Sequence, residues 1–359
     1  MSNILEYIKW RGDLSFKQDE INEIDIIIFA RVSYLPFKSI NLEQIDNIEN
    51  IAEKMKMLSI DKFIWKEDKE FILELGKSNR YKHLNISDYE EILDLEAEKQ
   101  FVATTIWLPN RYKYISYRGT DMSLVGWKED FNMSFMKDIP SQKESVKYIN
   151  KIGKKYKDKL IIGGHSKGGN LSIYSSMFCD DKINKRIVKI INADGPGFDK
   201  SVISTENYKK ILNRIVTFVP QSSIIGRLLE HEEEYQIVKS SQKGIMQHDI
   251  YSWQVNVKEL ERVENLTNDS KVLNKSVRDW LENTTPQQRE NFINIIYDIL
   301  VTTEAKEFTD FGVDTIKKIT LIIKSYRNIN REERKEMEEM IKLLFENIMK
   351  NIRKNKKEL

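Results

Sequence analysis

Apolar and polar residues along the middle of the chain predict strands and helices in alternation. Residues 99–108 and 113–117 are rich in β-branched and aromatic residues on either side of a turn at Pro109, which predicts a two-stranded hairpin. A helix is expected after Pro140, where apolar residues recur every three or four positions. Further strands are predicted at the apolar runs 159–163, 187–191, 215–219 and 235–239. Strands alternating with helices are typical of an α/β protein with a mostly parallel sheet.

The first hundred residues predict mostly helices. Residues 4–10 form a short predicted helix. The run 24–30 is apolar and β-branched, yet the apolar residues that follow it could extend it as a helix, so strand and helix both remain open. Residues 41–97 have helical spacing, many charges and no proline, and we expect helices that cover the sheet.

From about residue 258 the composition becomes helical and strongly charged, which predicts an α/β domain at 1–257 and a helical region at 258–359. Thr285, Pro286 and Gln288 have the spacing of a helix start. The last helix, from Arg331, is expected to place one apolar stripe on a single face: Met337, Ile341, Leu344, Ile348 and Ile352. Such a stripe favours ordinary packing over a membrane-surface or partner-binding helix.

The apolar run 159–163 leads into Gly164-His165-Ser166-Lys167-Gly168, which has the pattern Gly-x-Ser-x-Gly. That pentapeptide arises by chance in roughly one chain in ten of this length, so its context must decide. Here a predicted strand precedes it and a predicted helix follows. A sharp turn between strand and helix can hold a serine in strained geometry, with glycines allowing the close approach. Ser166 is therefore the candidate nucleophile.

A serine hydroxyl needs an imidazole to take its proton and a carboxylate to orient that imidazole. A serine held on such a strand–turn–helix is called a nucleophile elbow, and in proteins with this elbow the chain order is serine, acid, histidine. Of the four histidines, only His231 and His248 therefore qualify. His248 follows the last predicted strand and is favoured. His231 lies among glutamates, which predicts a solvated charged loop, with metal binding as a lesser alternative.

The acid has no candidate at its usual place, since the loop after the strand 215–219 reads Pro220-Gln221-Ser222-Ser223. Asp194, at the end of the preceding strand, is the nearest substitute because neighbouring strand ends converge on one edge of the sheet. A turn-forming aspartate before Gly195-Pro196 is an equally weighted alternative. Asp249 is too close to His248 in sequence to be preferred.

Acyl transfer also needs donors for the oxyanion. The backbone N–H of Lys167 is one by position, and Thr120, after Arg118-Gly119 at a strand end, is the expected second, with its hydroxyl as a further donor. Gly119 as a simple tight turn is the alternative.

The composition narrows the function classes. The 359 residues are 40% hydrophobic and 32% charged, as in globular proteins, and the net charge of +2 provides no field that would attract nucleic acid. The single cysteine, Cys179, cannot form an internal disulfide and is expected to be a buried helix residue. No secretion signal and no apolar run of about 18 residues is recognised, so we expect a soluble, cytoplasmic protein. No metal or cofactor is predicted.

Several blocks of the chain resemble a known family. Residues 117–120, Trp127 and Asp130, together with the Gly-His-Ser-x-Gly-Gly elbow, resemble the class 3 lipases, α/β-hydrolases that cleave carboxylic esters. A closer resemblance is to a bacterial family of uncharacterised, lipase-like α/β-hydrolases. It rests on four blocks within residues 1–255: Trp10-Arg11-Gly12-Asp13, His165-Ser166-Lys167-Gly168-Gly169-Asn170, Asp194-Gly195-Pro196-Gly197-Phe198, and Gln247-His248-Asp249 with Trp253.

The resemblance implies an α/β-hydrolase fold, Ser166 as nucleophile, His248 as base, and Thr120 with Lys167 at the oxyanion hole. It does not identify the acid. Lys167 stands where lipases commonly have leucine, which argues against a fully apolar lipid site.

The sequence therefore predicts a serine hydrolase that acts on a small-molecule or lipid-like ester. Two alternatives remain open: a non-catalytic scaffold that keeps the hydrolase fold, and a thioesterase or acyltransferase using the same residues. A protein partner or membrane surface could be engaged by the C-terminal helices.

Overall fold

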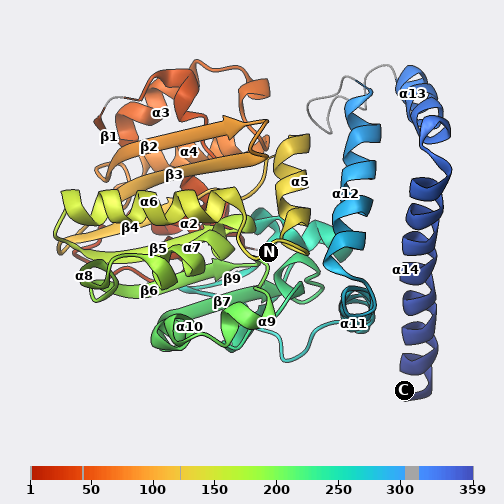
Figure 1. The fold of residues 1–359 in the computed structure, drawn as a ribbon. Helices are drawn as coiled ribbons and strands as arrows, with labels where there is room; N and C mark the ends of the chain where they lie inside the picture. The colour runs from red at the N-terminus through yellow and green to blue at the C-terminus, as the bar shows by residue number, and fades with distance from the viewer. Residues whose placement is uncertain (1, 43, 122, 304–314, 359) are drawn as a thin grey trace. The chain divides into compact units, whose positions relative to one another are not determined.

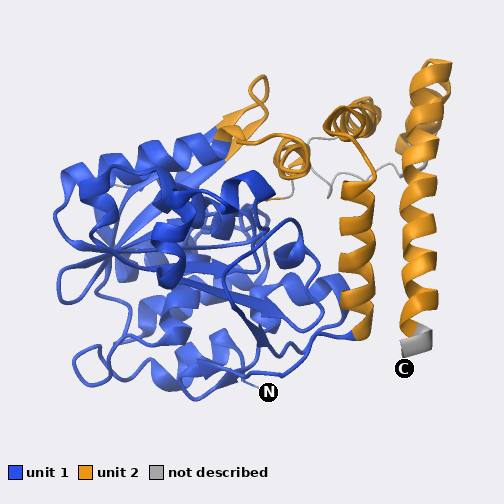
Figure 2. Cartoon of the chain, turned by 60° about the horizontal axis from the view of Figure 1, so that its bottom comes forward, with its two compact units in different colours: residues 1–92, 101–119, 141–267 blue, residues 93–100, 120–140, 268–359 orange. Residues whose placement is uncertain are grey.

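The structure, a computed structural model, describes residues 2–42, 44–121, 123–303 and 315–358. The chain divides into two compact units, coloured separately in Figure 2. The first comprises residues 1–92, 101–119 and 141–267, and the second residues 93–100, 120–140 and 268–359. The division predicted at 257 and 258 remains a prediction.

The central element is an eight-stranded sheet whose strands lie in chain order (Figure 1). Its strands are β1 (Ile45–Asn47), β2 (Asn85–Asp94), β3 (Lys99–Leu108), β4 (Tyr112–Tyr117), β5 (Lys159–His165), β6 (Ile187–Ala193), β7 (Ile215–Pro220) and β8 (Tyr235–Val238). β3 and β4 form the predicted antiparallel hairpin, with Ala103 opposite Tyr117, and β4 to β8 are parallel. The mostly parallel sheet flanked by helices is an α/β-hydrolase fold.

Helices cover both faces of the sheet (Figure 1). The helices of the first unit are α1 (Ile4–Arg11), α2 (Glu23–Val32), α3 (Ile48–Lys56), α4 (Glu67–Lys77), α6 (Pro140–Lys155), α7 (Lys167–Phe178), α8 (Asp181–Asn184), α9 (Lys200–Ile203) and α10 (Glu206–Ile211). α1 to α4 contribute to one apolar cluster, and α6, α7, α9 and α10 to another. Ile161 belongs to the first cluster and Ile162 to the second, because successive side chains of a strand point to opposite faces. Strands buried on both faces read as continuous apolar runs.

The structure decides the run that the sequence left open between strand and helix. Residues 24–30 lie in α2, which begins with a capping box between Asn22 and Asp25. Tyr114 of β4 donates a hydrogen bond to the carbonyl of Ile26 at 2.9 Å, so this helix packs directly on the sheet. A helix covered on all sides is apolar all round, which explains the missing helical period.

The prediction that residues 41–97 form only helices is wrong. α3 and α4 are present, but residues 85–94 form β2, which pairs with β1 on one side and lies beside β3 on the other. The outer half of β2 is only partly buried, so its charged residues gave it no apolar signature. Pairing with distant segments, rather than local pattern, makes this segment a strand.

The second unit is mainly helical. Its helices are α5 (Leu124–Asn132), α11 (Asn268–Glu282), α12 (Pro286–Val301), α13 (Thr315–Asn328) and α14 (Arg331–Glu358). The predicted start of α12 is confirmed, because Thr285 and Gln288 form a capping box and Pro286 is the first residue of the helix. The predicted start of α14 at Arg331 is also confirmed.

Only part of the apolar stripe predicted for α14 lies on the face that packs against the other helices. Met337 is buried, but Ile341 is 38% exposed, while Asn347 and Asn351 are buried. The amide of Asn351 donates to Asp279 of α11 at 2.9 Å. The face that packs on α11 therefore includes buried polar side chains, which hydropathy alone assigns to solvent.

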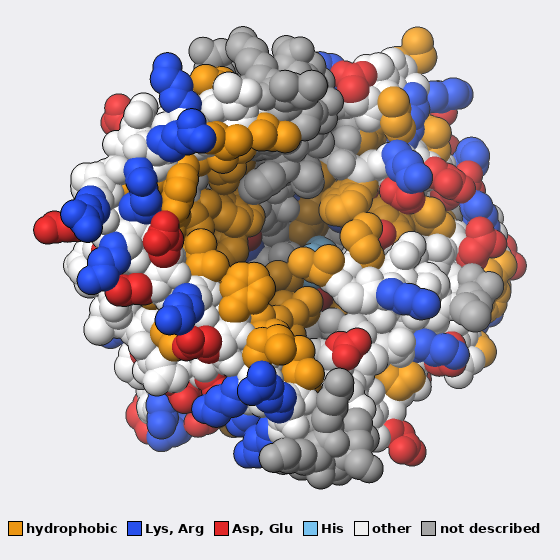
Figure 3. Space-filling view, turned by 90° about the vertical axis from the view of Figure 1, so that its right-hand side faces the viewer, with side chains coloured by type: hydrophobic (Ala, Val, Ile, Leu, Met, Phe, Trp, Pro, Cys, Tyr) orange, Lys and Arg blue, Asp and Glu red, His pale blue; other side chains and the backbone are white. Residues whose placement is uncertain are grey.

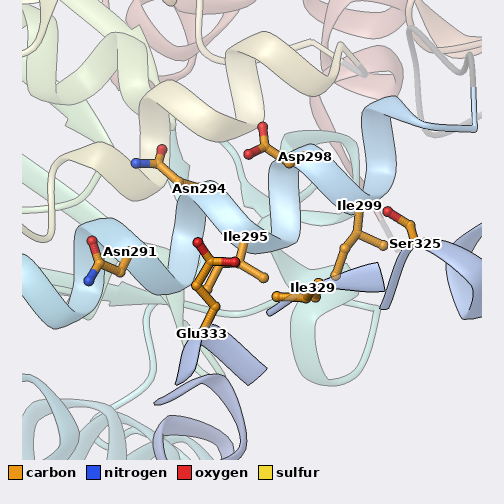
Figure 4. Close-up of a pocket in the computed structure, with 8 residues that line it drawn as sticks. All are labelled: Asn291, Asn294, Ile295, Asp298, Ile299, Ser325, Ile329 and Glu333. Carbon is orange, nitrogen blue, oxygen red and sulfur yellow. The ribbon is translucent and has the colours of Figure 1, made fainter. Parts of the chain in front are cut away.

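A cavity of about 330 Å³ lies among the C-terminal helices (Figure 4). It is lined by Asn291, Asn294, Ile295, Asp298, Ile299, Ser325, Ile329 and Glu333. Glu333 of α14 points toward Ile295 of α12 in this view. None of these residues belongs to the predicted catalytic set.

Hydrophobic side chains also gather on the molecular face seen in Figure 3, interspersed with charged ones. Exposed large apolar side chains include Met57 in the first unit and Phe345 on α14. Within the described ranges, no helix combines the length and apolar character needed to cross a membrane.

Candidate active site

Ser166 lies at the tip of a strand-to-helix turn between β5 and α7. Its backbone has φ +57° and ψ −133°, a conformation that non-glycine residues rarely adopt. The surroundings hold it there: its N–H donates to the carbonyl of Ala193 at 2.9 Å, and its own carbonyl accepts from Gly169 at 2.8 Å. Strain of this kind occurs where surrounding structure over-determines the backbone, often at functional sites.

The two glycines of the pentapeptide are required by close contacts rather than by their torsion angles. A Cβ on Gly168 would lie 2.1 Å from the carbonyl oxygen of Tyr117, and one on Gly164 would lie 2.4 Å from the carbonyl carbon of Gly168. The turn therefore packs directly against the end of β4, and a side chain at either glycine position would force the turn to move.

The structure brings His248 and Asp194 together, although they are 54 residues apart in sequence. The Nδ1 of His248 lies 2.6 Å from Oδ2 of Asp194, whose side chain is buried at the end of β6. Asp194 has φ +52°, and its N–H donates to the carbonyl of Phe218 on β7 at 2.8 Å. The imidazole of His248 remains 25% exposed. A buried carboxylate thus orients a solvent-accessible imidazole.

The second oxygen of this carboxylate is also held. Ser223 donates its hydroxyl to Oδ1 of Asp194 at 2.5 Å. A Cβ on Gly226 would lie 2.2 Å from the same oxygen, so the chain after β7 closes directly over it. The loop after β7, which has no carboxylate at 220–223, therefore supplies a hydroxyl group to Asp194 at the end of the neighbouring strand β6. No local sequence pattern singles out Ser223, and only its place after a strand end could have indicated this role.

Asp249 has a different partner. Its carboxylate accepts a hydrogen bond from the N–H of Tyr251 at 3.0 Å, and burial raises its pKa. It caps the short turn after His248.

The prediction of a solvated loop at His231 is wrong. The side chain is only 11% exposed, and its Nδ1 lies 2.9 Å from Oε1 of buried Glu233. Glu233 also accepts hydrogen bonds from Thr217, at 2.8 Å, and from Tyr208. Burial alone would raise the pKa of Glu233, but His231 and Tyr208 lower it overall. A buried carboxylate is costly unless it accepts hydrogen bonds, and His231 is buried together with Glu233 because its imidazole is one of these partners. Across the described residues, no cluster of three or more His, Cys, Asp or Glu side chains could hold a metal ion.

The predicted oxyanion donors, Lys167 and Thr120, lie in different segments of the chain. Lys167 is the first residue of α7, and its side chain is buried. Gly119 has no positive φ; a Cβ there would lie 2.6 Å from the carbonyl oxygen of His165 and 2.9 Å from Cβ of Ser166. Glycine is therefore required at position 119 because the backbone there lies too close to the elbow for a side chain. Thr120 follows it in the second unit, where its hydroxyl donates to Asp130 at 2.5 Å. That hydroxyl is thus committed to a carboxylate, and its role at an oxyanion remains a prediction.

Comparison with known proteins identifies the family. A model of the Mbeg1-like family matches residues 75–298, which is more than half of the chain. The chain belongs to the Mbeg1-like family. This family is lipase-like. Its match includes Ser166, Asp194 and His248, whereas α1, α2 and α14 lie outside the matched range.

Two solved lipase structures are similar to this Mbeg1-like protein. The native propeptide complex of Rhizomucor miehei lipase has 15% sequence identity and a TM-score of 0.38, with 59% of this chain and 66% of that chain covered. The M37 lipase has 18% identity and a TM-score of 0.37, with coverage of 58% and 70%. The chain spans just under two thirds of the Rhizomucor miehei lipase chain. No curated protein matches in sequence.

Cys179 does not offer a second nucleophile in this Mbeg1-like protein. The side chain is buried at the end of α7, as predicted, and burial raises its pKa to about 12. A thiol with such a pKa stays protonated at neutral pH, and the thiolate is the reactive form.

Proposed function

We propose that this Mbeg1-like protein is a serine hydrolase that cleaves a carboxylic ester through an acyl-enzyme on Ser166. The observation that carries the proposal is the 2.6 Å contact between His248 Nδ1 and Asp194 Oδ2. Membership of a lipase-like family supports hydrolase chemistry in general. The strained serine between β5 and α7 is the third component that this chemistry requires.

The reaction follows from the roles of these groups. His248 takes the hydroxyl proton of Ser166 through Nε2 as the oxygen attacks the ester carbonyl carbon. The resulting oxyanion would be stabilised by the N–H groups of Lys167 and Thr120. When the carbon–oxygen bond to the alcohol breaks, His248 returns the proton to the leaving oxygen. Water, activated by the same imidazole, then attacks the acyl-enzyme and releases the acid.

In this mechanism Asp194 fixes the orientation and the tautomer of the His248 imidazole. Because a carboxylate only accepts hydrogen bonds, Nδ1 of His248 must carry the proton, and Nε2 is left free to accept one from Ser166. Ser223 holds the other carboxylate oxygen at 2.5 Å, so the acid has a single orientation.

A fluorophosphonate probe tests the proposal directly. Wild-type protein should be labelled on the peptide that contains Ser166, and a panel of esters and thioesters of varied acyl length should reveal turnover. Folded wild-type protein that resists the probe would count against a nucleophilic serine. The ratio of ester to thioester turnover would separate an esterase from a thioesterase, and transfer to an added alcohol would indicate an acyltransferase.

Asp194→Asn should lower ester turnover by about 10⁴-fold with little change in fold. Asparagine tolerates a positive φ, so the backbone at +52° can persist. Its amide N–H would face Nδ1 of His248 and force the imidazole proton onto Nε2, where it blocks acceptance from Ser166. Steady-state kinetics and thermal melting measure the two effects.

Asp249→Asn is the matched control, because this neighbouring carboxylate serves only the N–H of Tyr251 in the contacts above. Its turnover should stay close to wild type. Equal losses in the two variants would move the acid away from Asp194.

A second function, contact with an anionic membrane surface, is favoured by α14. Ile341, Phe345 and Met349 are spaced four residues apart and are 38%, 62% and 49% exposed, while the face with Met337 and Asn351 is buried. Exposed cationic residues follow the stripe at Lys350, Arg353 and Lys354. An apolar stripe beside basic residues suits a helix that lies on an anionic lipid surface. Such contact would bring a lipid-like ester to the protein.

Phe345→Glu should reduce sedimentation with phosphatidylglycerol vesicles, because it places a charge in the middle of the stripe. Met57→Glu is the control, since Met57 is an 85% exposed apolar residue of the first unit. Equal binding of wild type to phosphatidylglycerol and phosphatidylcholine, or equal loss in both variants, would argue against this role for α14.

A further inference from the structure

His165, the residue before the candidate nucleophile, is a buried histidine that the proposed reaction does not use. It is the last residue of β5 and is 5% exposed. Both ring nitrogens have partners: Nε2 lies 2.7 Å from the backbone carbonyl oxygen of His248, and Nδ1 lies 3.1 Å from the hydroxyl of Tyr34. The two imidazole rings have centroids 4.5 Å apart. This ring therefore connects the elbow with the backbone of the candidate base.

The partners determine which nitrogen of His165 carries the proton. A carbonyl oxygen can only accept, so Nε2 must be the donor toward His248. Burial, followed by the influence of His248 and Arg31, holds the pKa of His165 well below its ordinary value. The ring is therefore neutral, and its bare Nδ1 accepts the hydrogen bond from Tyr34.

The hydroxyl of Tyr34 touches a third part of the site. It accepts a hydrogen bond from the N–H of Gly119 at 3.1 Å, and Gly119 immediately precedes the predicted oxyanion donor Thr120. It also lies 3.3 Å from the carbonyl oxygen of His165. One phenol thus contacts the end of β4, the end of β5 and the ring of His165.

A buried ion pair packs against the ring of Tyr34. The guanidinium of Arg31 lies 4.2 Å from the centroid of that ring and makes two hydrogen bonds of 2.7 Å to Asp68. Asp68 also accepts from the hydroxyl of Tyr251 at 2.7 Å. Tyr251 lies three residues after His248, so the network returns to the segment that carries the base.

We propose that His165 is a positioning residue that holds the backbone of His248 at the elbow by donating from Nε2, and that the hydroxyl of Tyr34 stabilises this tautomer through its contact with Nδ1. The role rests on the proposed function, since it concerns the same base. The imidazole of His248 is then held at two points: Asp194 orients the ring, and His165 fixes the carbonyl of the same residue. Misplacing a reacting group by about 1 Å can cost about 10²-fold in rate.

Three variants separate positioning from simple packing. His165→Gln keeps an N–H donor near the place of Nε2, His165→Phe keeps a planar ring without any donor, and Tyr34→Phe removes only the hydroxyl. We expect the rate constant for fluorophosphonate labelling to fall about 10²-fold in His165→Phe and about tenfold in Tyr34→Phe, with most of the wild-type rate recovered in His165→Gln. Thermal melting shows whether each variant is folded.

A packing role gives a different pattern. His165→Phe would then match or exceed His165→Gln in labelling rate, because phenylalanine fills the buried space more completely. That result in folded proteins would overturn the inference, whereas failure to label wild-type protein would refute the proposed function instead.

An NMR measurement tests the tautomer without any activity. The chain has four histidines, so spectra of protein with ¹⁵N-labelled histidine are simple to assign by comparison with His165→Gln. The charged or titratable groups that face His165 are Arg31 from α2, Tyr34 just after that helix, and His248 from its loop. We expect a neutral Nε2–H pattern for His165 that does not change between pH 8 and about pH 5, below the ordinary histidine pKa. Titration near pH 6.5, or an Nδ1–H pattern, would contradict the inference even if labelling succeeds.

Discussion

Replacing Ser166 with alanine is expected to lower turnover of any ester that the wild-type protein cleaves by about 10⁴-fold to 10⁶-fold, the range found for removal of a triad member. Alanine keeps the Cβ and the backbone constraints of the turn but removes the oxygen that would form the acyl-enzyme. The surrounding backbone bonds, including the 2.9 Å bond to Ala193, do not involve the hydroxyl. The variant should therefore fold normally and fail to react with the fluorophosphonate probe.

Ser201→Ala is the matched control, because Ser201 is an exposed serine at the start of α9. It should label and turn over substrate like wild type. If Ser166→Ala is still labelled to the same extent, then another residue is the nucleophile and the proposed mechanism is wrong.

His248→Ala is expected to have an effect of similar size, about 10⁵-fold to 10⁶-fold, because serine and histidine act as one unit and removing either abolishes the shared step. Its imidazole is partly exposed and bonded to Asp194, so its loss leaves the buried carboxylate with the hydroxyl of Ser223 as a partner. We expect a modest decrease in melting temperature beside the near-total loss of labelling.

His231→Ala distinguishes the two candidate bases. His231 is hydrogen-bonded to Glu233, which keeps Tyr208 and Thr217 as donors when the imidazole is removed. This variant should lose stability but retain most of its labelling rate. Loss of labelling in His231→Ala, with turnover preserved in His248→Ala, would reassign the base.

The apolar runs of the sequence were sufficient to place most strands of the sheet. β5, β6 and β7 are buried along most of their length, although Val188 and Lys189 of β6 are exposed, so apolar runs mark these strands and the signal is local. The turn at Ser166 was recognisable for the same reason, since its glycines are needed within five residues of one another. Helix starts such as Thr285-Pro286 were predictable because capping depends on neighbouring residues alone.

The partners of side chains far apart in sequence depended on the tertiary structure. Asp194 read equally well as a turn residue, and its contact with His248 exists only because β6 and the loop after β8 meet at one edge of the sheet. The same holds for Ser223, which donates to Asp194 from the next strand, and for His231, which is buried because Glu233 needs donors. β2 became a strand through pairing rather than through its own pattern.

The sequence by itself determined the strand–turn–helix around Ser166, the alternation of strands and helices, and the order of the candidate groups along the chain. Only the tertiary structure decided which carboxylate faces His248, which hydroxyl donates to that carboxylate, and how Tyr34 and His165 connect the elbow to the backbone of His248. The physical reason is range: backbone strain and burial period are properties of adjacent residues, whereas a hydrogen bond between residues 54 positions apart is created by the packing of the whole sheet.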